Sequence, residues 1–436
     1  MRTRYLYIGL YRFLKRKVYR SLTSLCENVK SCLADEYVVC GSLSVGIVTF
    51  LSILVVWLLL RDPCQQTKIT ESLCQQYHEG AIAGSWCYDI CVDRSIKLVH
   101  CLQQEPDVTT FFWNKAVIKV TGDLLEDDPK SESKAVSSKN MVLKEGLTVS
   151  AFKLLIQDYL NQKLGHVNHT TVCDQLIEFA DFNQDGKLSL GEATSVWQLL
   201  QIHEFFLLFL FQGSYAFPIL NGTCGSLYAM EYVDVHGLYQ NQPTSLINKV
   251  FSNSYRWSLP HWTKRANIGI GLLEYSAAIL EEADTRFFMC DFGPMNFGYT
   301  SNYELKVISV RNIMSESMLE YFMKSRNCLS DYECSYGNSC IAVCNRQTNR
   351  CTGEMKQPFL VGICELMKEY LLHDAPRRIR PELGLLLSKC VHLKDRGLDT
   401  ESYMGDLVSH HIIKHNLILN ELKLLLWKEI KDVQFL

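Results

Sequence analysis

Residues 181–192, DFNQDGKLSLGE, carry the oxygen ligands of a calcium-binding loop. In an EF-hand, loop positions 1, 3, 5, 9 and 12 supply side-chain oxygens, position 7 supplies its backbone carbonyl, and position 6 is a glycine. Here positions 1, 3 and 5 are Asp181, Asn183 and Asp185, and positions 9 and 12 are Ser189 and Glu192. Position 7 is Lys187 and position 6 is Gly186. Helical patterns lie on both sides of the loop, so we expect it to bind Ca²⁺ rather than to be a solvated acidic turn. The sequence has no second loop of this pattern.

A second candidate site is the segment CDFGPMN at residues 290–296, where two kinase-like patterns overlap. If its letters DFG were the metal-binding motif, the catalytic Asp and Asn would fall earlier, at positions that Leu273 and Ala278 occupy. The other interpretation fits better, because Asp291 and Asn296 reproduce the D-x-x-x-x-N spacing of a kinase catalytic loop. In that arrangement Asp291 is the catalytic base and Asn296 helps to hold a metal ion.

This interpretation predicts further positions that a phosphoryl-transfer site needs. The metal-binding Asp falls at Ser309, in the expected strand 303–310, and a neutral hydroxyl is a poor substitute for a carboxylate. Upstream, the letters VIK ending at Lys119 resemble the strand whose lysine holds the α and β phosphates of ATP. Its carboxylate partner is expected to be Glu204, which with His203 interrupts an apolar helix. The alternative is a strand-edge lysine and a solvent-facing glutamate.

The N-terminal region has the pattern of a membrane anchor. Residues 37–60 contain no formal charge, which is enough length to cross a hydrocarbon core of about 30 Å. Residues 1–36 hold eight basic and three acidic side chains, and the positive-inside tendency therefore places them in the cytosol. We expect a single-pass type II protein; a cleaved signal peptide is the alternative, but the apolar run is too long and too far from Met1. The triplet Arg2-Thr3-Arg4 resembles retrieval signals of endoplasmic reticulum membrane proteins, although a basic flank alone would also contain it.

The cysteines and glycosylation sequences agree with this orientation. Fifteen of the 18 cysteines follow Arg61, which predicts disulfides in an oxidising compartment rather than zinc ligands, since paired Cys-x-x-Cys units are lacking. Because fifteen is odd, one thiol is expected to be free or intermolecular. Asn168 and Asn221 begin N-x-T triplets, which a lumenal enzyme glycosylates. Two clusters stand out: Cys64, Cys74, Cys87, Cys91 and Cys101, and Cys328, Cys334, Cys340, Cys344 and Cys351.

The expected elements indicate an α+β arrangement of two lobes. We predict a loop-like cysteine-rich start, a strand over 111–120, an exposed loop over 122–140, helices over 149–164 and 171–180, a long apolar helix over 193–211, two short strands within 217–233, a helix over 265–283, strand and turn over 287–310, and helices from 355 onward. The predicted domains are a cytosolic tail (1–36), a transmembrane helix (37–60), a cysteine-rich lumenal segment (61–104), an N-lobe (105–233) with an EF-hand insert (about 165–202), and a C-lobe (234–436) with a disulfide-rich insert (328–351).

Taken together, these features resemble the divergent protein kinase domain 1 family. The resemblance rests on the anchor and first cysteine cluster, the calcium loop followed by WQLLQIHE, the CDFGPMN segment, the second cysteine cluster, and the ending LILNELKLLLWKEI. It implies a two-lobed protein-kinase-like fold in the endoplasmic reticulum, with Lys119, Glu204, Asp291 and Asn296 as site residues. The sequence departs from the family at Ser309, where relatives carry Asp. It also lacks a glycine-rich phosphate loop before Lys119, and Cys290 replaces the Arg of H-R-D.

Three functions follow as expectations. The first is a lumenal calcium-binding kinase-like protein that uses ATP with Mg²⁺ or Mn²⁺ to phosphorylate a hydroxyl on a secreted protein or glycan. The second is a catalytically inactive pseudokinase that acts by binding, with calcium setting the angle of the helix that carries Glu204. The third is an adhesion or receptor module without a nucleotide site. A nucleic-acid partner is not expected, because the net charge is -3 and no basic surface stands out.

Overall fold

The chain divides into two compact units, residues 1–63 and 64–436. The computed structural model describes parts of the second unit, which are residues 64–104, 108–121, 148–165, 169–239, 259–281, 285–310, 312–324, 326–393 and 404–434. The predicted cytosolic tail, the predicted membrane span 37–60, the loop 122–140 and Asn168 lie outside these residues. Within them, no single helix is long and apolar enough to cross a membrane; Leu190–Gln201 and His203–Leu210 reach that length and composition only as a pair, and the pair is bent by 99°.

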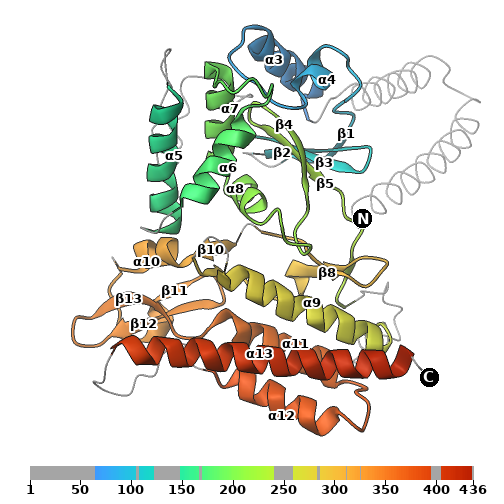
Figure 1. The fold of residues 1–436 in the computed structure, drawn as a ribbon, viewed down its shortest axis with the longest axis vertical. Helices are drawn as coiled ribbons and strands as arrows, with labels where there is room; N and C mark the ends of the chain where they lie inside the picture. The colour runs from blue at the N-terminus through green and yellow to red at the C-terminus, as the bar shows by residue number, and fades with distance from the viewer. Residues whose placement is uncertain are drawn as a thin grey trace, which may run out of the picture. The chain divides into compact units, whose positions relative to one another are not determined.

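A five-stranded antiparallel sheet forms the N-terminal part of the second unit (Figure 1). In spatial order its strands are β1 (His100–Gln104), β2 (Val108–Trp113), β3 (Ala116–Thr121), β5 (Leu227–Glu231) and β4 (Leu220–Cys224). Helices α3 (Gln66–His78) and α4 (Cys87–Cys91) bury Ile69, Leu73 and Ile90 against one face of this sheet. The sequence prediction of a loop-like segment before residue 104 is therefore wrong, since α3 is a regular helix that the disulfide of Cys74 with Cys91 ties to α4.

Residues 111–120 form a hairpin rather than the single strand predicted for them. The strands β2 and β3 pair in register from Val108 with Thr121 to Trp113 with Ala116. Asn114 and Lys115 connect them, with φ angles of 39° and 65°. Two successive residues with positive φ are what a tight two-residue turn between antiparallel strands requires, and asparagine tolerates that conformation better than most residues.

Four helices lie between β3 and β4 in the chain: α5 (Val149–Leu164), α6 (Thr170–Ala180), α7 (Leu190–Gln201) and α8 (His203–Leu210). The predictions for α5 and α6 are confirmed, but the single helix expected over 193–211 is wrong. Ile202 is extended, with φ -84° and ψ 106°, and separates α7 from α8. No glycine or proline causes this break. It lies where His203 and Glu204 make contacts outside their own helix, described below, so tertiary contacts override the helical propensity.

The C-terminal part is mainly helical and is built around α9 (Trp262–Glu281), which packs against α11 (Phe359–Leu372) and α13 (Met404–Gln434). Helix α12 (Arg380–Val391) packs on α11 and α13. Short antiparallel strands follow α9 in the sequence and precede α11; one further strand, β6, comes before α9. Strand β7 (Phe287–Met289) pairs with β10 (Ile313–Ser315), and β8 (Phe297–Tyr299) pairs with β9 (Leu305–Val307) and with β6 (His236–Gly237). The prediction of a helix over 265–283 is confirmed within the described residues, as is that of strand and turn over 287–310. The strand expected over 303–310 is shorter, however, since β9 ends at Val307 and Ser309 lies beyond it.

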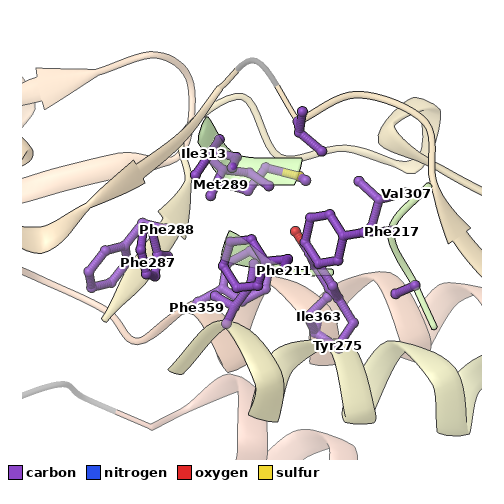
Figure 2. Close-up of a cluster of buried hydrophobic side chains, with 14 of the residues drawn as sticks. Phe211, Phe217, Tyr275, Phe287, Phe288, Met289, Val307, Ile313, Phe359 and Ile363 are labelled. Atoms are coloured by element: carbon purple, nitrogen blue, oxygen red, sulfur yellow. The ribbon is translucent and has the colours of Figure 1, made fainter. Parts of the chain in front are cut away.

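An aromatic cluster joins these elements in the interior (Figure 2). The rings of Phe211 and Phe217 stack 4.5 Å apart, and Phe211 also meets Phe287 edge-on at 5.2 Å. Tyr275 from α9 packs between Phe217 and Phe359, at 5.7 and 5.8 Å. All five side chains are buried. Segments before, within and after α9 therefore share one continuous core, which holds the loops that follow β7 and β9 in place.

Residues 316–355 form a disulfide-rich module of helix α10 (Glu316–Lys324), the short helix η6 (Asp331–Glu333) and a sheet of β11 (Ser335–Tyr336), β12 (Cys340–Asn345) and β13 (Arg350–Met355). The sulfurs of Cys328, Cys334 and Cys351 lie within 4.8 Å of one another, but each belongs to a disulfide, as the preference for disulfides over zinc predicted. Among the described residues, seven disulfides leave Cys173 free, which agrees with the odd count. The pairs are Cys64–Cys101, Cys74–Cys91, Cys87–Cys224, Cys290–Cys340, Cys328–Cys344, Cys334–Cys351 and Cys364–Cys390.

Candidate active site

Lys119 and Glu204, which are 85 residues apart in sequence, form a direct ion pair. The Nζ atom of Lys119 lies 2.6 and 2.7 Å from the two carboxylate oxygens of Glu204. Only 9% of the lysine side chain and 14% of the glutamate side chain are exposed. The interpretation of these two residues as a pair is therefore supported by their geometry, and the alternative of a solvent-facing glutamate is wrong.

The sheet register explains why Lys119 points toward α8. In β3, Ile118 and Val120 belong to the core under α3 and α4, so Lys119 between them faces the opposite side of the sheet. Its partner across the β3–β5 pairing is Tyr228, whose hydroxyl donates to the Glu204 carboxylate at 3.1 Å. The carboxylate thus receives hydrogen bonds from both members of a cross-strand pair, which is what a buried charge requires.

His203 connects α8 with the C-terminal part. Its Nε2 atom lies 2.7 Å from the carbonyl oxygen of Ile313 in β10, and burial lowers the pKa of the imidazole. A neutral ring with its proton on Nε2 donates this hydrogen bond. Because Ile313 pairs with Met289 at the end of β7, the residue beside Glu204 is anchored next to the strand that leads into Asp291.

Asp291 and Asn296 lie on the loop between β7 and β8, which ends in the short helix η5 (Pro294–Asn296). The Oδ1 atom of Asp291 accepts a hydrogen bond from the backbone amide of Asn338 at 3.0 Å. Among the described residues, the other oxygen of Asp291 and the side-chain amide of Asn296 have no hydrogen-bond partner. Both side chains are half-buried and retain polar atoms that a ligand could use.

The residue before Ser309 is hydrogen-bonded to this loop. The backbone amide of Ile308 donates to the carbonyl oxygen of Asn296 at 2.7 Å, just after the β8–β9 hairpin. Ser309, the position predicted for a metal-binding Asp, is therefore the next residue after Ile308, which is hydrogen-bonded to Asn296. Of the three positions expected to act as base or metal ligand, which are Asp291, Asn296 and Ser309, only Asp291 is a carboxylate. These residues therefore fit Mg²⁺ or Mn²⁺ bound weakly better than the same ion bound tightly.

The phosphate-binding loop of a kinase would lie between β1 and β2, upstream of Lys119. The connecting residues 105–107 read EPD and contain no glycine. Two of these three residues, Glu105 and Asp107, are acidic. The glycine-rich sequence that is missing before Lys119 would therefore have been expected in the connection between β1 and β2.

The loop 181–192 connects α6 to α7 and has hydrogen bonds typical of a calcium loop. Oxygens of Asp181 and Asn183 each accept from the backbone amide of Asp185 at 3.0 Å. Gly186 has φ 72° and donates to Asp181 at 2.8 Å. The side chains at positions 1 and 3 are therefore turned into the loop, as a Ca²⁺ site requires.

The last ligand position is coupled to the start of α7. Glu192 is only 3% exposed, and its carboxylate accepts from the backbone amide and the hydroxyl of Ser189 at 2.8 Å. The Ser189 hydroxyl in turn accepts from the amide of Glu192, completing a capping box. The donor set of Asp181, Asn183, Asp185, the Lys187 carbonyl, Ser189 and Glu192 fits Ca²⁺ in its oxygen chemistry.

Three contacts at the candidate active site escaped the sequence analysis. Tyr228 gave no signal beyond a strand pattern, and the bond of His203 to Ile313 depends on a carbonyl that any residue could supply. A partner for Cys340 outside its cluster could have been suspected, because each cluster holds five cysteines and at least one in each has no partner within it. Asn221, the glycosylation candidate in the described part of the chain, is exposed on the edge strand β4.

Two family models match this chain. Residues 196–393 match a model described as the protein-kinase domain of FAM69, and residues 23–178 match one described as the N-terminal cysteine-rich ER region of FAM69. The chain belongs to the FAM69 family. This match confirms the resemblance to the divergent protein kinase domain 1 family and shows that the mixed helix and strand fold contains a kinase-like domain. The FAM69 kinase-domain match includes Glu204, Asp291 and Asn296, whereas the calcium loop 181–192 falls between the two matched ranges.

One solved structure similar to this FAM69 member is titled the complex structure of Rv3197-erythromycin from Mycobacterium tuberculosis. The two chains share 10% sequence identity, with a TM-score of 0.24 over 88% of this chain and 94% of the other. A similarity at this level carries no argument about function. The kinase-like assignment therefore rests on the FAM69 match and on the contacts described above.

Proposed function

We propose that this chain is a calcium-binding, kinase-like protein of the endoplasmic reticulum that binds ATP with Mg²⁺ or Mn²⁺ and phosphorylates a hydroxyl of a secreted protein or glycan. The observation that carries the proposal is the buried ion pair of Lys119 and Glu204. In protein kinases, a strand lysine held by a helix glutamate positions the α and β phosphates. A buried pair of charges is costly to maintain, so its presence at this position favours a role in ligand binding.

Each remaining site residue has a role in this proposal. The oxygen of Asp291 that is not bonded to Asn338 accepts the proton of the attacking hydroxyl. Asn296 contributes its side-chain oxygen to the metal ion, with Ser309 as a weak further ligand. Because metal electrostatics supply much of the barrier reduction in phosphoryl transfer, we expect turnover to be slow.

The second candidate function is a pseudokinase that binds nucleotide without turnover. Ser309 favours it, because a hydroxyl replaces the main metal carboxylate of the family. The lack of a glycine-rich sequence before Lys119 favours it as well, because that loop covers the phosphates in protein kinases.

Localisation and calcium binding belong to the same proposal. The cysteine-rich region whose family description names the ER, the seven disulfides and the basic residues before position 37 support a type II anchor with residues 61–436 in the lumen. The donor set of the loop 181–192 supports Ca²⁺ as a resident ion. Glycans at Asn168 and Asn221 would report this topology directly.

Turnover of ATP by the full-length chain separates the two candidate functions. We expect slow release of phosphate with Mn²⁺ present, abolished in Asp291→Asn because the amide cannot accept the proton. Ser309→Asp should increase the rate about tenfold or more, by adding a carboxylate to the metal. Nucleotide binding without turnover in the wild type would support the pseudokinase. If Ser309→Asp changes neither turnover nor metal-dependent ATP affinity, the assignment of residues 291–309 is wrong.

A further inference from the structure

The disulfide-rich module holds the loop that carries Asp291 by a covalent bond. Cys290, the residue before Asp291, forms a disulfide with Cys340 at the start of β12, and their Cα atoms are 4.8 Å apart. Both cysteines are buried, with 0% and 4% of their surface exposed. Because the other two disulfides of the module close within it, this bond is the one that ties the module to the candidate active site.

Three hydrogen bonds reinforce this link, all from the turn between β11 and β12. The amide of Ser339 donates to the carbonyl oxygen of Cys290 at 2.8 Å. The amide of Asn338 donates to the Oδ1 atom of Asp291 at 3.0 Å, and the hydroxyl of Ser339 accepts from the amide of Phe292 at 2.9 Å. The turn is therefore hydrogen-bonded to three consecutive residues of the loop, Cys290, Asp291 and Phe292.

Gly337 allows this close approach. Its φ angle is 62°, and a Cβ atom at this position would lie 2.3 Å from the carbonyl oxygen of Cys290 and 2.7 Å from the Oδ1 atom of Asp291. Any side chain here would push the turn away from the loop. A glycine is thus required both by the backbone conformation and by the contact with the site.

The contact orients Asp291 rather than blocking it. The turn occupies one carboxylate oxygen, and among the described residues the other has no donor. In protein kinases the residue before the catalytic Asp is an arginine, and activation loops are ordered when phosphorylated residues pair with arginine. Here Cys290 occupies the position of that arginine, and its disulfide with Cys340 replaces a charged side chain with a covalent link to the module.

We propose that residues 337–340 are a positioning clasp for Asp291, in which Cys340 fixes the loop and the amide of Asn338 sets the orientation of the carboxylate. Gly337, Asn338, Ser339 and Cys340 act on the reaction through Asp291 and are positioning residues. The consequence for phosphoryl transfer rests on the proposed function; the ordering of the loop does not.

Hydrogen exchange of the full-length chain without nucleotide tests the ordering. In Ser339→Ala the amide of Phe292 loses its acceptor, and we expect its exchange to become about tenfold faster, whereas Ser339→Thr retains the hydroxyl and should restore the slow rate. Gly337→Ala should accelerate exchange across residues 290–296. The matched control is Gly353→Ala, in the same module, with φ 85° and a Cβ position 2.7 Å from Glu320. Unchanged exchange in Ser339→Ala, or equal acceleration in Gly353→Ala and Gly337→Ala, would overturn the clasp.

Kinetics then test the consequence. We expect Ser339→Ala to lower kcat about tenfold while KM for ATP stays the same, and Ser339→Thr to recover kcat. A loss that appears in KM alone contradicts a role in positioning Asp291. If the wild type shows no turnover, the proposed enzyme function fails, and the exchange result alone decides whether the clasp exists.

Discussion

Glu204→Gln is expected to lower the free energy of unfolding by about 3–5 kcal/mol, because it leaves the ammonium group of Lys119 buried without a charged partner. The surface pair of Glu320 and Lys324 provides the control, since both side chains are well exposed. Glu320→Gln should cost less than about 1 kcal/mol. Chemical denaturation of the full-length chain measures both variants.

A double replacement separates the ion pair from simple packing. Lys119→Met with Glu204→Met removes both charges and retains apolar volume, so we expect the double variant to be more stable than Glu204→Gln. If the single and double variants lose equal amounts of unfolding free energy, the pair does not behave as a buried ion pair. A loss below about 1 kcal/mol in Glu204→Gln would lead to the same conclusion.

Calcium is expected to stabilise the protein by about 2.7 kcal/mol when its free concentration is a hundred times the dissociation constant. Glu192→Gln should abolish this gain, because an amide cannot replace the bidentate carboxylate of position 12. The capping box accepts glutamine as well as glutamate, so this variant should retain most of its stability without calcium. Thermal denaturation with calcium and with a chelator measures both quantities.

The control for calcium is Asp158→Asn, on the exposed surface of α5 and outside the loop. It should respond to calcium as the wild type does. A calcium gain that persists in Glu192→Gln would show that the ion binds elsewhere. No gain in the wild type would mean that the loop is a solvated acidic turn.

The route from calcium to Glu204 differs from the one expected from the sequence. A single helix from the loop to Glu204 would have transmitted a change of angle directly, but α7 and α8 meet at a bend of 99°. Besides the chain through Ile202, direct ring contacts connect the helix before the loop with α8, since Phe179 lies 6.0 Å from Phe205 and 5.3 Å from Phe209. Mechanical coupling by continuity of one helix is therefore wrong.

Local patterns predicted the elements with strong periodicity. Helices α5, α6 and α9 and the strands around the candidate catalytic loop follow from alternation or helical spacing in their own sequences. The hairpin turn at Asn114 and Lys115 was missed because it lacks glycine, the usual signal for positive φ. The break at Ile202 was missed because its cause lies in contacts with distant residues, which no local pattern records.

The candidate site was predictable where chemistry fixes residue type. Lys119 and Glu204 stood out because a charge in an apolar segment needs a partner, and their contact follows from that requirement. Asp291 and Asn296 stood out by spacing alone. The clasp of residues 337–340 could not be found this way, because it acts mainly through backbone amides and a disulfide whose pairing the sequence leaves open.

Binding of ATP with Mn²⁺, measured by calorimetry, tests most directly whether Lys119 and Asn296 belong to one site. The wild type is predicted to bind, and two variants from distant parts of the chain, Lys119→Met/Glu204→Met and Asn296→Ala, should each weaken binding about tenfold or more. Glu320→Gln should bind as the wild type does. A folded wild type that does not bind, or binding that either variant leaves unchanged, would contradict a shared nucleotide site.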